Sequence, residues 1–344
     1  MSNLFMEDKL QKLHHIVQNK RKVLIVTHTN PDPDSIASAY ALRHLFASWE
    51  VNSVLVYGGI IGRSENKAMI KRLRIPIRSI QTINPFNFKV VSLVDAQPSS
   101  GNAPIPRSLV PGIVVDHHPL RKAPSLKEIP FVDIRPEYGS TSTILAEYLL
   151  EEGVEITRKL ATALYYGIMS DTMDLGRAAK AVDVRMSADL YPKVLVKTLS
   201  QIEHPRLPRE YFRILQEALG RTTWYPPKGV LISELGAVVE PDMVAIIADF
   251  LIRMEGVRWV FALGERDQEV FFSLRTTGYH KGSADQLARS LIRGLEGGGA
   301  GGHEATAGGR VSSSPEKRDE IKEKLRERLL KRLGCGISKG IPFV

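Results

Sequence analysis

The stretch that most constrains the fold is an apolar run that ends in an acidic turn. Residues 23–26 read Val-Leu-Ile-Val, which predicts a buried strand. The run ends at His28, and the following turn carries Asp32 and Asp34, each preceded by a proline. A helix is expected over residues 36–49. Because open α/β sheets bind ligands at the carboxyl ends of their strands, this turn is a candidate binding site.

Two explanations account for this turn. Carboxylate and imidazole groups together suit a divalent cation, and the prolines stiffen the loop that would hold it. A turn that only caps the next helix, with Asp34 or Ser35 as the N-cap, explains the same residues. The choice depends on what the other predicted strands carry.

Three more apolar segments are followed by acids or imidazoles. They are residues 91–94, followed by Asp95; residues 113–115, followed by Asp116, His117 and His118; and residues 161–169, followed shortly by Asp171. If the strands are parallel neighbours, these side chains meet at one edge of the sheet. A pair of turn histidines or a helix cap explains any one of them alone. The coincidence of four such segments favours a metal site.

The order of the predicted elements indicates an α/β protein. Strands are expected at 51–57, 89–94, 113–115 and 131–134, and helices at 6–20, 36–49, 65–73, 140–152 and 157–170. This alternation predicts a mostly parallel sheet with helices on both faces. We assign residues 1–195 to this domain, 196–227 to a helical connection, and 228–344 to a smaller mixed α/β domain.

The second domain is predicted from shorter patterns. Strands are expected at 230–232, 259–263 and 270–274, and helices at 241–254, 283–295 and 315–333. The last helix is highly charged but carries Ile321, Leu325, Leu329 and Leu333 at a spacing of four residues. That spacing predicts a helix that packs one face against its domain.

A glycine-rich tract spans residues 297–309. By composition it resembles a flexible linker. No Gly-Lys-Ser/Thr follows, which excludes a Walker A loop, and Ala307 stands where a zincin helix would need a second histidine. Because predicted elements flank the tract, we place it inside the domain, where glycines let backbone N–H groups approach a phosphate.

The composition bounds the class of protein. The net charge of +9 points to anionic partners without singling out nucleic acid, and lysines that aid solubility explain it equally well. Cys335 is the single cysteine, which excludes an intrachain disulfide or a thiolate metal site. The amino terminus is too polar for a signal peptide, and no apolar run reaches membrane-spanning length. We therefore expect a cytoplasmic protein without a membrane partner.

Taken together, the motifs resemble those of the DHH phosphoesterase superfamily. The matching segments, in order, are 28–34, 94–95, 116–118 and 170–172. The Gly-Gly-His sequence at 301–303 resembles the DHH-associated carboxy-terminal domain, which in that family closes over the metal site. The resemblance covers about residues 10–335, and it implies a phosphoester hydrolase with its active site in the cleft between the two domains.

The resemblance also implies roles for individual residues. One cation would be bound by His28, Asp32 and Asp95, and a second by Asp34, Asp95, His117 and Asp171, with Asp95 bridging. Asp116 would orient His117, and His118 would face the substrate phosphate or the leaving oxygen. Arg275, Gly301, Gly302 and His303 would bind substrate, although a surface role is an equal alternative for Arg275. Histidine ligands favour Mn²⁺, with Mg²⁺ as the alternative.

Within that family, the compact two-domain length favours the nanoRNase and phosphoadenosine-phosphate phosphatase type. Substrates would then be short RNA or DNA oligonucleotides or small phosphorylated nucleotides. A soluble cyclic-dinucleotide phosphodiesterase and a catalytically inactive nucleotide-binding regulator are the alternatives. Thr172-Met173-Asp174 after Asp171, and the extra residues before His303, depart from the family pattern and leave the substrate subclass open. Some members of the family dimerise through carboxy-terminal helices. The resemblance therefore leaves a homodimer open as an alternative to a monomer.

Overall fold

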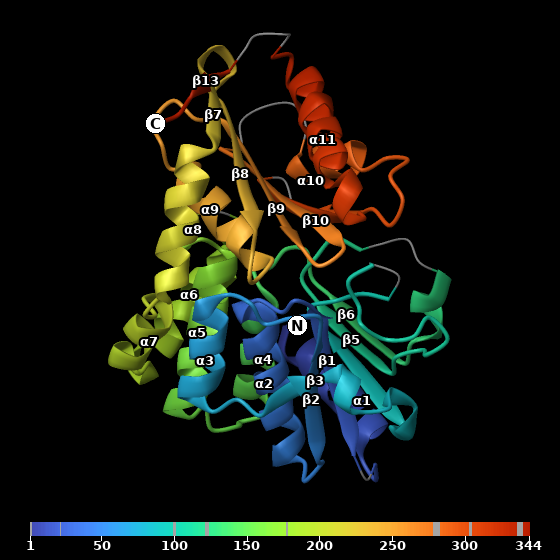
Figure 1. Cartoon of the computed structure of the whole chain (residues 1–344). Helices are drawn as coiled ribbons and strands as arrows, with labels where there is room; N and C mark the ends of the chain where they lie inside the picture. Colours follow the sequence, from blue (N-terminus) through green and yellow to red (C-terminus); the bar gives the residue numbers. More distant parts are fainter. Residues whose placement is uncertain are drawn as a thin grey trace. The chain divides into compact units, whose positions relative to one another are not determined.

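The computed structural model describes residues 2–20, 22–98, 101–120, 124–176, 178–277, 283–302, 305–335 and 340–344. The chain divides into two compact units, Met1–Pro205 and Arg206–Val344 (Figure 1). The segment expected to connect the domains contributes one helix to the first unit, and one helix and one strand to the second.

The first unit contains a parallel sheet of six strands in the order β3-β2-β1-β4-β5-β6. The strands are β1 (Val23–Thr29), β2 (Ser53–Gly58), β3 (Ile77–Ser79), β4 (Val90–Val94), β5 (Ile113–Asp116) and β6 (Phe131–Ile134). Every neighbouring pair is parallel, as predicted. The chain turns one way from β1 to β2 and the other way from β4 to β5. The carboxyl ends of β1 and β4 therefore flank the switch point at which such sheets bind ligands.

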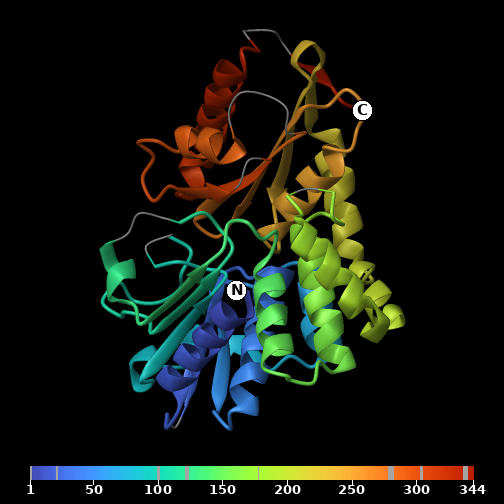
Figure 2. The ribbon, with the colours of Figure 1, turned by 180° about the vertical axis from the view of Figure 1, so that it is seen from behind.

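Helices cover one face of this sheet, as seen in Figure 2, in which the molecule of Figure 1 is viewed from behind. They are α1 (Ser2–Val17), α2 (Pro33–Ser48), α3 (Ser64–Leu73), α4 (Thr141–Glu151), α5 (Arg158–Asp171), α6 (Ala181–Leu190) and α7 (Val196–Glu203). Residues of α1–α5 share one buried cluster with Val23 and Ile25 of β1. Among the described residues, the opposite face, with Leu24 and Val26, packs against loops and 3₁₀ turns instead of the expected helices. The connections there contain Pro85, Pro98, Pro104 and Pro106, which do not continue an α-helix.

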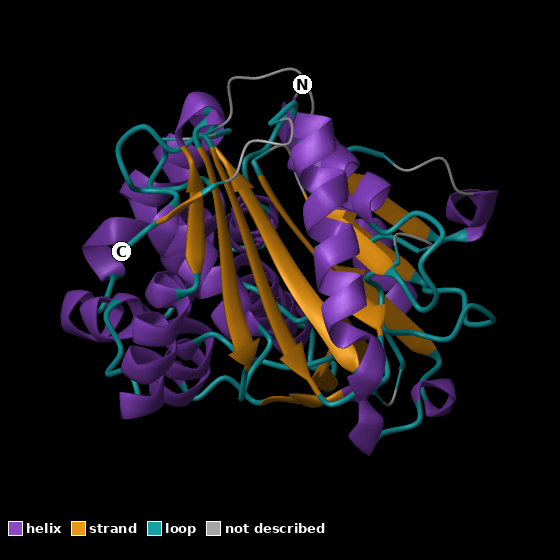
Figure 3. Cartoon of the chain, turned by 45° about the horizontal axis from the view of Figure 1, so that its top comes forward, coloured by secondary structure: helices purple, strands orange, loops and turns teal. Residues whose placement is uncertain are grey.

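The second unit, expected to be a mixed α/β domain, contains a sheet of parallel and antiparallel strands in the order β11-β12-β10-β9-β8-β7-β13 (Figure 3). The strands are β7 (Thr222–Tyr225), β8 (Val230–Ala237), β9 (Trp259–Arg266), β10 (Glu269–Thr276), β11 (Gly299–Gly302), β12 (Thr306–Ser312) and β13 (Ile341–Pro342). The helices are α8 (Arg209–Gly220), α9 (Asp242–Leu251), α10 (Ala284–Leu291) and α11 (Arg318–Leu333). Helices α10 and α11 pack on one face, and α8 and α9 on the other. The predicted apolar stripe of α11 is confirmed, since Leu325 and Leu329 are fully buried.

The glycine tract forms two paired strands at the edge of this sheet. Residues Gly299–Gly302 pair antiparallel with Ala307–Arg310. A Cβ atom on Gly302 would lie 2.2 Å from the carbonyl oxygen of Thr306, so the close pairing requires glycine there. Within the described residues of both units, no helix is long and apolar enough to cross a membrane.

Candidate metal centre

The first group of possible metal ligands lies at the carboxyl ends of β1 and β4. The Nε2 atom of His28 lies 3.5 Å from Asp32 Oδ1 and 3.6 Å from Asp95 Oδ2. On the other side of the ring, Nδ1 lies 2.9 Å from the carbonyl oxygen of Thr29. An N–H donated to that carbonyl presents Nε2 to a cation, as is usual for metal-bound histidine. Asp32 is also the N-cap of α2, with Oδ1 accepting the N–H of Ser35 at 2.9 Å, so capping and metal binding are compatible here.

A second group joins α2, the end of β5 and the end of α5. It consists of Asp34, His117 and Asp171, which offer ligand atoms within 4.8 Å of one another. The Nε2 atom of His117 lies 3.1 Å from Asp171 Oδ2 and 3.7 Å from Asp95 Oδ1. Asp95 thus contacts the histidines of both groups.

Asp34 is fixed by the amino terminus of α4. Its Oδ2 atom accepts the N–H of Thr141 and its Oδ1 atom accepts that of Ser142, both at 2.8 Å. These backbone groups have no partner within the helix, and the helix dipole favours negative charge at this end. The side chain of Ser140 caps the same turn. Asp34 is therefore a buried carboxylate in a fixed position, about a hundred residues away in sequence from the helix that holds it.

Asp95 adopts a backbone conformation that is unusual for a residue other than glycine, with φ of 57°. Such left-handed residues are concentrated where function requires a particular direction of the side chain. The hydroxyl of Thr141 donates to Asp95 Oδ1 at 3.0 Å, and the N–H of Asp95 donates to the carbonyl of Val115 at 2.9 Å. Asp95 is 2% exposed, so its direction is fixed by the surrounding protein.

Asp116 orients His118, and the prediction that it would orient His117 is wrong. Its Oδ1 atom accepts the backbone N–H of His118 at 3.1 Å and lies 2.8 Å from the Nδ1 atom of that ring. Residues two apart on an extended chain share a side, whereas neighbours point to opposite sides. The carbonyl oxygen of Tyr138, 3.3 Å from His117 Nδ1, takes the place expected for Asp116.

The electrostatics of the cluster reflect many carboxylates in a buried space. Burial opposes the charged form of His28, yet Asp32 and Asp95 outweigh it and raise its pKa to about 9. In the same way, Asp171 and Asp95 raise the pKa of His117 to about 10. Burial raises the pKa of Asp34 well above its ordinary value, and the neighbouring charges of Asp95 and Asp171 add to the effect. The carboxylates therefore repel one another unless positive charge lies among them.

The residues present fit divalent cations. His117 Nε2 is buried, and its contact with Asp171 lacks the geometry of a hydrogen bond, so this nitrogen has no hydrogen-bond partner among the described residues. Carboxylate oxygens and imidazole nitrogens are suitable ligands for Mn²⁺ or Mg²⁺. Of the residues that the structure describes, three groups lie close enough together to hold an ion: His28–Asp32–Asp95, Asp34–His117–Asp171 and Asp95–His117–His118. The division of the ligands between two cations, with Asp95 bridging, stays a prediction.

The predicted substrate residues lie in the second unit. Arg275 is 7% exposed, which rules out a surface role. Its Nε atom lies 2.5 Å from Asp249 Oδ1, and its Nη1 atom donates to Ser273 Oγ at 2.7 Å. Gly301 and Gly302 belong to the edge strand β11. His303 lies outside the described residues, and its role stays a prediction.

Several residues that shape the centre were missed in the sequence. Thr141, Ser142 and the carbonyl of Tyr138 contact the predicted ligands, and Gln97 donates to Asp116 Oδ2 at 2.7 Å. The run Gly-Ser-Thr-Ser-Thr at 139–143 carries a signal for a helix amino terminus. Which carboxylate that terminus would hold depends on tertiary packing.

Comparison with known proteins agrees with this geometry. Residues 22–168 match the DHH family, N-terminal domain, and residues 228–331 match the DHHA1 domain. An uncharacterized protein of Methanocaldococcus jannaschii is 34% identical over 320 residues, which are 93% of this chain and 63% of that protein. A probable manganese-dependent inorganic pyrophosphatase of Archaeoglobus fulgidus is 30% identical over 44% of this chain and 49% of its own. The chain thus spans less than two thirds of the length of these curated relatives.

A solved structure supports the fold over almost the whole chain. An exopolyphosphatase-related protein from Bacteroides fragilis superimposes with a TM-score of 0.73 and 16% identity, covering 95% of this chain and 97% of that one. At this identity the likeness concerns the fold alone. With both domain matches present, in the order expected from the motifs, the chain belongs to the DHH superfamily and carries a DHH domain followed by a DHHA1 domain.

Proposed function

We propose that this chain is a phosphoester hydrolase that uses two divalent cations. Mn²⁺ is the favoured ion and Mg²⁺ is the alternative. Its substrates are short oligonucleotides or small phosphorylated nucleotides such as phosphoadenosine phosphate. The observation that carries the proposal is the convergence of His28, Asp32, Asp34, Asp95, His117 and Asp171 at one sheet edge. The relative from Archaeoglobus fulgidus, a probable manganese-dependent inorganic pyrophosphatase, supports both the phosphate chemistry and the metal.

Bound cations would supply a water nucleophile at neutral pH and would offset the negative charge of the phosphate. The protein holds the metal-binding carboxylates in fixed positions. Asp34 is held by two backbone N–H groups, and Asp95 by the Thr141 hydroxyl and its own strained backbone. The ligand positions are therefore set before any ion binds, which lowers the cost of ordering them.

His118 is proposed to donate the proton that the leaving oxygen needs. Burial opposes its charged form, but hydrogen bonds and charge from Asp116 and Asp95 raise its pKa to about 12. Asp116 Oδ1 lies 2.8 Å from Nδ1 of the ring and fixes its direction. Asp116 acts through His118 and is a positioning residue in this proposal.

The substrate residues Arg275, Gly301, Gly302 and His303 remain part of the proposal. The glycines of β11 lie on an edge strand, where backbone N–H groups can be offered to a phosphate. Arg275 would have to leave its ion pair with Asp249 to contact a substrate. We therefore expect Arg275 to contribute less to substrate binding than the glycines and His303.

The direct test is hydrolysis by the purified chain with Mn²⁺. The substrates are a dinucleotide, a five-nucleotide RNA, phosphoadenosine phosphate, a cyclic dinucleotide and pyrophosphate. We expect turnover of the dinucleotide or of phosphoadenosine phosphate, abolished by EDTA and by Asp95→Ala. The exposed Asp189→Ala provides a charge-matched control that retains activity. Turnover of the cyclic dinucleotide or pyrophosphate alone would overturn the substrate assignment. Metal binding without any turnover would favour a nucleotide-binding regulator.

A further inference from the structure

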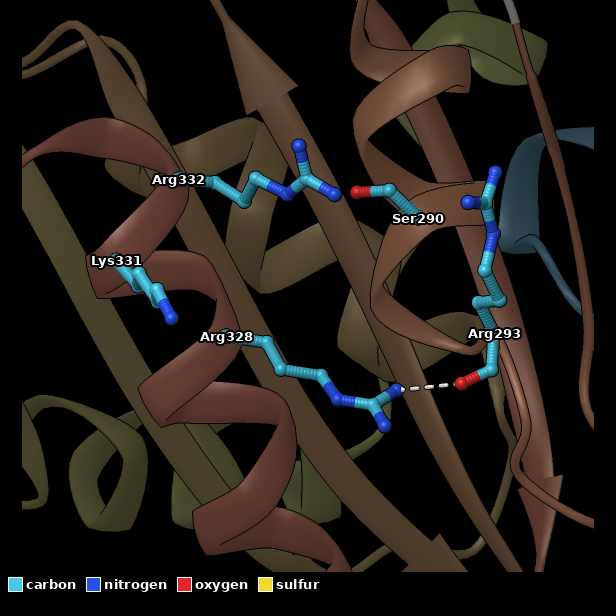
Figure 4. Close-up of a pocket in the computed structure, with 5 residues that line it drawn as sticks. All are labelled: Ser290, Arg293, Arg328, Lys331 and Arg332. Atoms are coloured by element: carbon cyan, nitrogen blue, oxygen red, sulfur yellow. Dashed lines mark hydrogen bonds between the residues drawn. The ribbon is translucent and has the colours of Figure 1, made fainter.

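The second unit contains a pocket that belongs to none of the sites described so far. It has a volume of about 570 Å³ and is lined by Ser290, Arg293, Arg328, Lys331 and Arg332. Ser290 lies on α10 and Arg293 just beyond it, whereas the other three cations lie on α11. Figure 4 shows the α11 side chains extending toward α10, with the guanidinium of Arg332 directed at Ser290.

Three cations lie along the flank of α11 that faces α10. Arg328, Lys331 and Arg332 are spaced by three and four residues, which places them on one flank. Among the other cations of α11, Arg318, Lys322 and Arg326 lie within ion-pair distance of carboxylates. Lys322 lies 2.9 Å from Glu265 Oε2 and 2.8 Å from Asp319 Oδ1. Lys331 and Arg332, which line the pocket, differ from these three cations because no described carboxylate lies at ion-pair distance from them.

The protein accounts for part of this positive charge but not for all of it. Arg328 donates to the carbonyl oxygens of Leu291 and Arg293, which closes the carboxyl end of α10. Within the described parts of the chain, Arg293, Lys331 and Arg332 have no carboxylate at ion-pair distance. The carboxyl ends of two helices supply only about half a negative charge each. Several positive charges thus converge on the hollow without a matching anion.

The lining identifies the kind of ligand. Its described residues include no carboxylate that could bind a cation, no aromatic ring on which a base could stack, and no large apolar side chain that could enter a lipid layer. Guanidinium groups match the geometry of phosphate oxygens, and the Ser290 hydroxyl adds a further polar group. Contacts of this kind bind a nucleic acid without reading its sequence.

We propose that this pocket binds successive phosphates of a nucleic acid backbone. It is a second contact, in the DHHA1 unit and made by residues other than the metal ligands of the first unit. It goes beyond the proposed hydrolysis because it concerns strands longer than the dinucleotides on which that activity is tested. Binding here is electrostatic, weakens with salt, and does not depend on divalent cations.

The test is the binding of a fluorescein-labelled twelve-nucleotide RNA, measured by anisotropy in EDTA. Lys331→Gln/Arg332→Gln should raise the Kd roughly 10- to 30-fold at about 0.1 M salt, because each lost phosphate contact removes about 0.7 from the salt slope. Arg158→Gln/Lys159→Gln is the matched control. It removes the same two residue types from an exposed helix end in the first unit, and its Kd should stay within about twofold of wild type.

A second pair of substitutions tests whether local unfolding, instead of the lost charge, explains weaker binding. Lys331→Glu/Arg332→Glu should weaken binding further than the glutamine pair, and both variants should melt within a few degrees of wild type. The proposal is overturned if the glutamine pair binds RNA like wild type, or if the control pair weakens binding equally. Loss of binding to phosphatidylserine vesicles with RNA affinity unchanged would overturn it in favour of a membrane surface. The assay requires no turnover, so its outcome is independent of the hydrolase proposal.

Discussion

At the scale of single residues, the metal centre depends on groups that hold the ligands as much as on the ligands themselves. Thr141 serves two carboxylates at once, since its backbone N–H reaches Asp34 and its hydroxyl reaches Asp95. Partners of this kind typically alter metal affinity by about 10- to 100-fold when removed. Thr141 was not among the ligands expected from the sequence, and it offers a test that leaves every ligand in place.

Thr141→Val should weaken Mn²⁺ binding by about 10-fold or more, because Asp95 loses its hydroxyl donor while the shape of the side chain is kept. Thr141→Ser retains the hydroxyl and should bind Mn²⁺ like wild type. Isothermal titration with Mn²⁺ measures both. Equal affinities of the valine and serine variants would show that the hydroxyl does not position Asp95.

Asp133 is a buried acid outside the metal centre and governs stability at low pH. Burial opposes its charged form, but Arg135, Lys9 and Tyr148 outweigh it and lower its pKa below the ordinary 3.8. A lowered pKa in the folded state stabilises the protein above the unfolded pKa, and this contribution is lost as the pH falls through the folded value.

Asp133→Asn should lower the free energy of unfolding at pH 7 by about 1–3 kcal/mol, because the buried Arg135 loses one of its two carboxylate partners and keeps only Glu147. Urea unfolding at several pH values measures the effect, and the difference from wild type should narrow toward acid. The exposed Asp189→Asn serves as the control. A variant as stable as wild type at pH 7 would contradict the assigned ion pair.

At the scale of elements, prediction succeeded where a side-chain pattern exists. The apolar runs of β1, β4 and β5 and the acids and histidines that follow them were sufficient to expect one site, because parallel neighbours bring their ends together. Strand β11 was missed because glycines show no alternation of apolar and polar side chains. Strand β13 is only two residues long, and its pairing with β7 is set by tertiary contact. The contact between Asp34 and the amino terminus of α4 is likewise set by tertiary packing, so the local sequence does not predict it.

The glycine strands permit a test of close packing within the DHHA1 unit. Gly302→Ala should destabilise this unit by about 1–3 kcal/mol, since the added Cβ would clash with backbone. That atom would lie 2.2 Å from Thr306 O, whereas a Cβ atom on Gly301 would lie 3.7 Å from the Arg289 side chain, an ordinary van der Waals contact. Gly301→Ala should therefore melt close to wild type. Equal melting temperatures of the two variants would contradict the pairing of β11 with β12.

At the scale of the whole molecule, two chemically opposite features lie on different units. The DHH domain gathers carboxylates and histidines, and the DHHA1 domain gathers three arginines and a lysine around a pocket. The net charge of +9 can be counted from the sequence. That four cations face one pocket cannot be predicted from the sequence, because it depends on the packing of α10 beside α11. Both domains match their family models, so the order of the motifs along the chain was a sound guide to its architecture.

The most direct test of the central claim is anomalous diffraction from crystals grown with Mn²⁺. We predict two peaks about 4 Å apart, one beside His28 and Asp32 and the other beside Asp34, His117 and Asp171, with Asp95 contacting both. Crystals in which the ordered Mn²⁺ lies away from these side chains, or in which the cluster remains without any peak at saturating Mn²⁺, would contradict the account.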